Sequence, residues 1–183
     1  MANKVSAGKP KSAGGAIFRA PAGTAVPTDA VAELGAAFVS LGLIAEDGVS
    51  NENETSVEKV KAWGGVEVAA FQTEYSETYG WTMIEVDVEA LKVAYGDENV
   101  IVDEETGAIH VKHNGNEKEE SVFVIETLLS GNRVKRTVIP RGKLEELGEV
   151  VMVDNEPIGY EVTVSALADD GGDTSHEYIA SIA

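Results

Sequence analysis

Apolar and polar positions alternate along much of the second half of the chain, which is the pattern of β-strands with one buried face. The clearest case covers residues 157–166, where Ile158, Tyr160, Val162 and Val164 share one face. The opposite face carries small or polar side chains: Gly159, Glu161, Thr163 and Ser165. Similar runs predict further strands at residues 66–71, 80–88, 108–113, 121–129, 133–140, 149–153 and 176–182. We therefore expect a mainly antiparallel β-protein.

Two short turn sequences predict hairpins between these strands. Ser130-Gly-Asn132 separates two runs rich in β-branched residues, and Asn114-Gly115 follows a shorter run. Asn-Gly favours a type I′ turn, since both of its central residues need a positive φ. The acids and lysines that follow Asn114-Gly115 are expected to lengthen that loop.

A single helix is predicted at residues 88–95, where the hydrophobic spacing changes from two to three or four. Val88, Leu91 and Tyr95 form one apolar stripe, Asp87 can cap the first turn and Gly96 can follow the last. A helix of two turns does not hold itself in water. It must therefore pack against the sheet.

The first third of the chain is apolar but has no regular period, because Gly and Pro interrupt it. Such a segment must be buried, either along a partner or wrapped in extended form around its own domain. A short helix within residues 28–41 is possible, and residues 51–56 have the composition of a polar loop. We accordingly divide the chain into a flexible basic leader (1–14), an extended arm and loop for contact between subunits (15–56) and a β-sandwich (57–183). Candidate contact residues are Ile17, Phe18, Arg19, Phe38, Leu43, Ile44 and Trp63.

Charge narrows the function further. The 183 residues include 14 Lys and Arg against 32 Asp and Glu, a net charge of −18. Such an acidic protein is poorly suited to wrapping nucleic acid, because phosphate contacts need Lys and Arg. It suits solubility, or a surface that nucleic acid passes without binding. The chain has no cysteine, and we find neither an export signal nor an apolar run long enough for a membrane span.

A search for catalytic, cofactor and metal sites finds none, so an enzyme is not expected. His110 and His113 would point to opposite faces of their strand, and the acids of residues 169–173 lack the spacing of a calcium loop. Three bases stand close together at Arg133, Lys135 and Arg136. They fit either an electrostatic contact with an acidic neighbouring subunit or a solvated strand.

Several phrases resemble the major tail proteins, or tail tube proteins, of long-tailed double-stranded DNA bacteriophages, especially those of actinobacterial hosts. The phrases are Gly15-Ala-Ile-Phe-Arg-Ala-Pro, Ala45-Glu-Asp-Gly-Val, Ala62-Trp-Gly-Gly, Lys135-Arg-Thr-Val-Ile-Pro and Ile158-Gly-Tyr-Glu-Val-Thr. None of them is a chemical signature, and their order and spacing carry the resemblance.

The resemblance implies a β-sandwich or barrel of the tail-tube type with one short helix on its flank and a long irregular N-terminal arm. It further implies hexameric rings that stack into a tube in the virion tail, assembled in the host cytoplasm, with a continuous inner barrel. Tape-measure, terminator and baseplate proteins would be partners, and DNA would pass through without specific binding during genome ejection. In such a ring, Glu161, Thr163 and Ser165 are candidates to face the lumen. The alternatives are the inner tube of a contractile or secretion-type injection system and an extracellular β-sandwich binding module.

Overall fold

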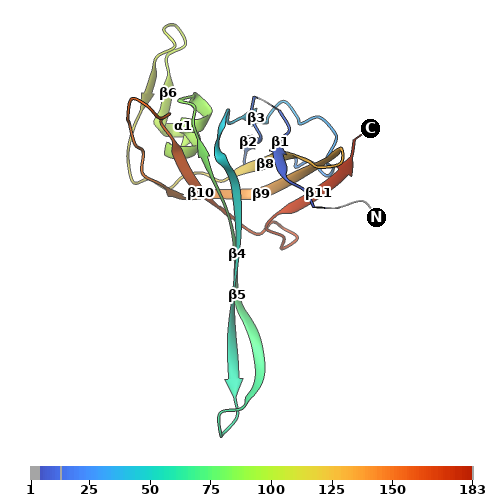
Figure 1. Ribbon diagram of the computed structural model, residues 1–183. Helices are drawn as coiled ribbons and strands as arrows, with labels where there is room; N and C mark the ends of the chain where they lie inside the picture. Colours follow the sequence, from blue (N-terminus) through green and yellow to red (C-terminus); the bar gives the residue numbers. More distant parts are fainter. Residues whose placement is uncertain (1–4, 13, 183) are drawn as a thin grey trace.

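The computed structural model describes residues 5–12 and 14–182, and this part of the chain is mainly antiparallel β-structure with one α-helix, as predicted (Figure 1). Its strands are β1 (Gly8–Pro10), β2 (Ile17–Pro21), β3 (Val39–Ser40), β4 (Ile44–Lys61), β5 (Glu67–Met83), β6 (Val100–Val102), β7 (Ile109–Val111), β8 (Ser121–Leu129), β9 (Arg133–Leu147), β10 (Tyr160–Ala166) and β11 (His176–Ser181). The main sheet has the order β3-β2-β8-β9-β10-β5-β4, with β1 beside β8 and β11 beside β9. Strands β6 and β7 pair separately.

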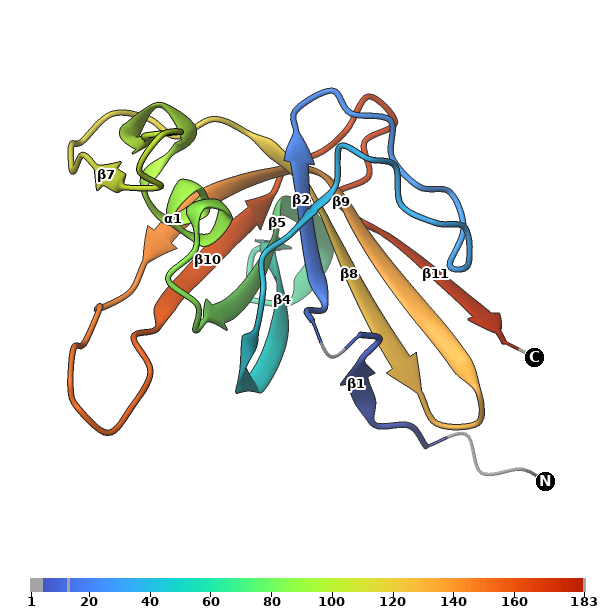
Figure 2. The same cartoon turned by 90° about the horizontal axis from the view of Figure 1, so that it is seen from above.

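Strand β9 connects two groups of strands. Its first part pairs with β8 and β11, and residues 142–147 pair with β10. Figure 2 shows the two groups fanning apart, with the helix α1 (Val88–Tyr95) close to β10. The hairpin between β8 and β9 is confirmed at Ser130-Gly-Asn132, where Gly131 and Asn132 have φ values of 78° and 54°.

The core lies where the alternating faces of β5 and β10 meet the helix. Tyr79, Trp81 and Met83 of β5 are buried and pair in register with Val164, Val162 and Tyr160 of β10. The Trp81 ring packs edge-on against Phe123 at a centroid distance of 5.4 Å. Leu91 of α1 is buried in the same cluster, with Val88 and Tyr95 partly buried against it. These contacts confirm the predicted stripe and place Trp81 in the core.

The first third of the chain is largely built into the body rather than free of it. Strand β2 lies next to β8 in the main sheet, and Ile17 and Leu41 are fully buried in the core of their own chain. Residues 28–41 form no helix; instead the Asp29 carboxylate accepts hydrogen bonds from the backbone N–H groups of Val31 and Ala32. Strand β2 is largely buried on both faces, so apolar and polar residues do not alternate along it. This is why residues 17–21 showed no regular period in the sequence.

Residues 8–10 of the expected flexible leader (1–14) instead form β1, which pairs with β8, and residues 1–4 and 13 lie outside the described residues. Three further local predictions are wrong. Residues 51–56 are not a loop but lie within β4, so the boundary expected at residue 56 falls inside a strand. Asn114-Gly115 is not a hairpin turn, because the strand before it, β7, pairs with β6 instead. Residues 149–153 are not a strand: Val151, Met152 and Val153 are exposed and have no strand beside them.

Candidate assembly surfaces

A long hairpin of β4 and β5 projects from the body (Figure 1). Its strands pair continuously outward to Lys61 and Glu67, with register shifts after Ser56 and after Val60. The turn is closed by a hydrogen bond from the Ala62 N–H to the Val66 carbonyl at 2.8 Å. Gly64 and Gly65 supply its positive φ values of 102° and 87°, which other residues rarely adopt.

The outer part of this hairpin, residues 55–75, is called the distal hairpin below. Its large apolar side chains are exposed rather than packed: Val57, Val60, Trp63, Val66, Val68, Phe71 and Tyr75. Trp63, at the turn, is 106% exposed. Monomeric soluble proteins rarely expose apolar side chains in such a concentration, which marks an association surface.

The distal hairpin extends the core face of the body beyond the body itself. Along β5, Tyr79, Trp81 and Met83 point into the core, and Tyr75 continues the same side of the strand outward. Beyond Tyr75 the register shifts between Ser56 and Val57, so Phe71 pairs with Glu58 and lies on the other side of the hairpin. Both Tyr75 and Phe71 are exposed, so each side of the distal hairpin carries a large uncovered ring. The face that is a core at the root is thus uncovered from Tyr75 outward, and exposed apolar side chains stand on both sides of the distal hairpin.

A buried carboxylate fixes the root of the hairpin. Glu77 accepts hydrogen bonds from Asn51 Nδ2 of β4 at 3.0 Å, from the Tyr79 hydroxyl at 2.9 Å, from the Ser175 hydroxyl at 3.1 Å and from the Thr174 hydroxyl. Burial alone would raise the pKa of Glu77, but these donors outweigh it and hold the pKa below its ordinary value. The cluster joins both strands of the hairpin to the segment before β11.

A second surface, opposite the core, is polar. Glu161, Thr163 and Ser165 of β10 point away from the core, and Glu161 is exposed. Their partners on β5 are Thr82, Gly80 and Thr78, and the same side of the sheet continues on β4 through Ser50, Glu52 and Glu54. We call this set of residues the polar sheet face. It offers hydroxyls and carboxylates and no apolar stripe.

The edge of the sheet beside this face is open. Strand β4 ends the strand order, and within the described residues it pairs only with β5. A long unpaired strand edge readily pairs with another chain.

The basic cluster makes its contacts within the chain. Arg136 is only 1% exposed, and its Nε donates a hydrogen bond to the Glu126 carboxylate at 2.9 Å. Its Nη1 donates to the Asp29 carbonyl at 2.8 Å, and its Nη2 donates to the Ala32 carbonyl at 2.7 Å. It therefore holds the loop between β2 and β3 on the sheet and presents no surface to a neighbour in this structure.

The other two bases of the cluster are partly exposed. Arg133 donates to the Ser6 hydroxyl at 2.6 Å, and Lys135 forms an ion pair with Glu177.

The candidate contact residues of the first third are divided by the fold. Ile17 is in the core, and Arg19 is buried with its Nε donating to the Ser121 hydroxyl at 2.9 Å. Leu43 is exposed, whereas three others are intermediate: Phe18, Phe38 and Ile44. Trp63 lies far from all of them at the hairpin tip. Sequence reasoning missed the hairpin because residues 51–56 are polar on both faces, which hides the alternation of a strand.

Neither a metal site nor a membrane helix is found in the described part of the chain. Within residues 5–12 and 14–182, no three His, Asp or Glu side chains group closely enough to hold a metal ion. In the same residues, no helix has the length and apolar character needed to cross a membrane.

An antiparallel β-body with a projecting apolar hairpin and an open sheet edge has the form of a structural subunit that assembles with other chains. The family model described as phage tail tube protein matches residues 2–181, and the chain belongs to that family. It is a structural subunit of the phage tail and not an enzyme. The family implies a tube assembled from copies of the chain together with other tail proteins of the virion. No curated protein matches the chain.

Proposed function

We propose that this chain forms hexameric rings that stack into the tail tube of a long-tailed phage, and that the tube is the conduit for genome ejection. The observation that carries the proposal is the distal hairpin, whose large apolar side chains are left exposed by the described part of the chain. Burying such side chains is favourable by about 1.5–3 kcal/mol each. The number six comes from the resemblance to tail tube proteins, as do the tape-measure, terminator and baseplate partners and assembly in the host cytoplasm.

Ring closure fits the open edge of β4. A β-sheet protein with an exposed edge pairs without control unless the edge is covered, and closing a ring of identical subunits covers every edge at once. In the proposed ring, the β4 edge of each subunit pairs with a strand of the next subunit. The sheets would then join into an inner barrel.

The polar sheet face is proposed to line the lumen. Glu161, Thr163 and Ser165 stand on it beside the hydroxyls and carboxylates of β5 and β4. Six copies of net charge −18 give a ring of −108. A lumen that carries part of this charge repels the phosphate backbone, so DNA slides through without binding.

The proposal is tested by shortening the hairpin. In the variant, residues 57–73 are replaced by an Asn-Gly turn that joins Ser56 to its strand partner Glu74, which keeps the register of the root. The root, including Glu77 and its donors, remains. We expect the wild-type chain to sediment as large particles at high concentration and the shortened chain to stay folded and form no tube-sized particles. The near-ultraviolet circular dichroism of buried Trp81 reports the fold.

A control variant keeps the hairpin and replaces Val151, Met152 and Val153 by serine in the exposed loop between β9 and β10. It should assemble like the wild type. Assembly of the shortened chain to the same extent as the wild type would contradict the proposed role of the hairpin.

A further inference from the structure

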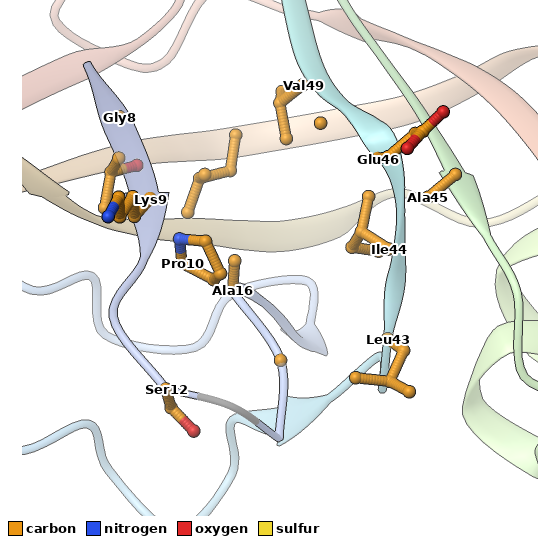
Figure 3. A pocket seen from close by; sticks show the side chains of 14 residues that line it. Gly8, Lys9, Pro10, Ser12, Ala16, Leu43, Ile44, Ala45, Glu46 and Val49 are labelled. Carbon is orange, nitrogen blue, oxygen red and sulfur yellow. The ribbon is translucent and has the colours of Figure 1, made fainter.

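A cavity of about 360 Å³ lies between β1 and the start of β4 (Figure 3). Pro10 and Ile44 face each other across it, with Ala16 between them. Val49 and Ile125 add to its apolar lining. The cavity exists because β4 leaves its regular pairing with β5 between Ile44 and Val49, so residues 45–48 bulge away from the sheet.

The rim of this cavity is acidic on the side of the bulge. Glu46 lines the cavity and its side chain turns outward in Figure 3; the next residue in the bulge, Asp47, is also exposed. On the opposite side of the cavity, Lys9 of β1 is the basic residue that lines it. An apolar pocket with acids at one side fits an apolar group that has a positive charge beside it.

The hairpin tip has that combination. Trp63 is fully exposed, and the residues around it, 59–66, include Lys59 and Lys61 but no acid. Lys59 already pairs with Glu67 of its own hairpin at 3.1 Å. Lys61 stands next to the turn and is exposed.

The tip cannot reach the cavity of its own chain. The cavity lies at the root of β4, and the strand runs outward from Val49 to Lys61. At roughly 3.3 Å per residue, these twelve steps span about 40 Å. Any tip that enters the cavity therefore belongs to a second copy.

We propose that Trp63 of one copy inserts into this cavity of a copy in the neighbouring ring, with Lys61 beside Glu46 and Asp47. The inference rests on the proposed tube and names the docking site of its hairpin. The contact joins two different surfaces, a tip and a pocket, and between stacked rings such a contact repeats without closing, so it extends the assembly along the tube axis. The axial repeat between rings can then be at most about 40 Å, the length of the outer strand.

Cross-linking tests the contact directly, since the chain has no native cysteine. One chain carries Ala62→Cys, which keeps Trp63, and a second carries Ala16→Cys in the cavity. The control for the second chain is Ala180→Cys, a similarly half-exposed alanine on β11. After co-assembly and a short bismaleimide, we expect heterodimers with Ala16→Cys and at least tenfold fewer with Ala180→Cys. Adding Trp63→Ala to the tip chain should reduce the Ala16→Cys product by a similar factor.

Tryptophan quenching tests the same contact without cysteines. Trp81 is buried in the free chain, so acrylamide quenching reports mainly Trp63. We expect Trp63 to be protected in wild-type tubes and to stay quenchable in assemblies of Ala16→Leu, which fills the cavity. Tubes that protect Trp63 equally in both chains, or that give no Ala16→Cys product, would overturn the docking site and leave the tube intact. A wild-type chain that forms no assembly would overturn the proposed function itself.

Discussion

At the scale of single residues, the root of the hairpin depends on Glu77. Its carboxylate accepts hydrogen bonds from hydroxyl and amide groups on three segments and is only 6% exposed. Glu77→Gln replaces one acceptor oxygen by a donor that faces other donors. We expect the free energy of unfolding at pH 7 to fall by about 1–3 kcal/mol, measured by urea denaturation.

The same residue gives a pH dependence of known sign. The pKa of Glu77 is lower in the folded chain than its ordinary value of 4.5. The stability that it supplies is thus present above pH 4.5 and is lost as the pH falls through the lowered value. The difference between wild type and Glu77→Gln should shrink over that range. A constant difference from pH 7 down to pH 3 would contradict this role.

Arg136 is the second residue whose loss should be costly. It is buried and pairs with Glu126, so Arg136→Met leaves that carboxylate with Lys11 as its remaining ion-pair partner. Breaking a buried pair from one side costs about 3–5 kcal/mol. Thermal or urea unfolding should show this loss for Arg136→Met and a much smaller one for the partly exposed Arg133→Met.

At the scale of elements, the chain was predictable wherever one face of an element is buried and the other is wet. The helix α1 satisfies that condition, and Asp87 and Gly96 mark its ends. The β8–β9 hairpin does not, because residues 121–126 are buried on both faces; its turn residues and its β-branched runs made it predictable. β2 is buried on both faces, and the middle of β4 is exposed on both, so neither shows alternation. The exposed valines of residues 149–153 show the reverse error, because β-branched composition without a partner strand does not make a strand.

The candidate surfaces follow the same logic. The polar side of β10 could be predicted from its alternation. Whether the basic cluster is buried or exposed could not, because Arg136 pairs with Glu126 and with loop carbonyls that are distant in the sequence. Trp63 was chosen as a contact candidate from its sequence context. Its position at a projecting tip could not be predicted, because the sequence did not indicate that β4 pairs with β5.

The helix gives the test at this scale. Leu91 is 5% exposed and packs in the main core. Leu91→Ala should therefore lower the free energy of unfolding by about 2–5 kcal/mol. Val86→Ala, at an exposed position just before the helix, is the matched control. A loss well below 1 kcal/mol for Leu91→Ala would show that the helix is peripheral to the core.

At the scale of the whole molecule, the acidic charge of the chain bears on how DNA passes through the proposed tube. Glu161→Lys reverses a charge on the polar sheet face without touching the core. We expect tubes of normal shape that bind a fluorescent DNA oligonucleotide, most strongly at low salt, because salt screens the attraction. Glu104→Lys, on the exposed turn between β6 and β7, should bind less. Equal binding by the two variants would place Glu161 outside the lumen.

The most direct test of the whole account is an electron micrograph of the concentrated, purified wild-type chain. The account predicts hollow tubes with regular cross-striations, spaced at no more than about 40 Å along the axis, the reach of the hairpin. A chain that stays monomeric at every concentration and salt condition, or that forms only solid fibres, would contradict it.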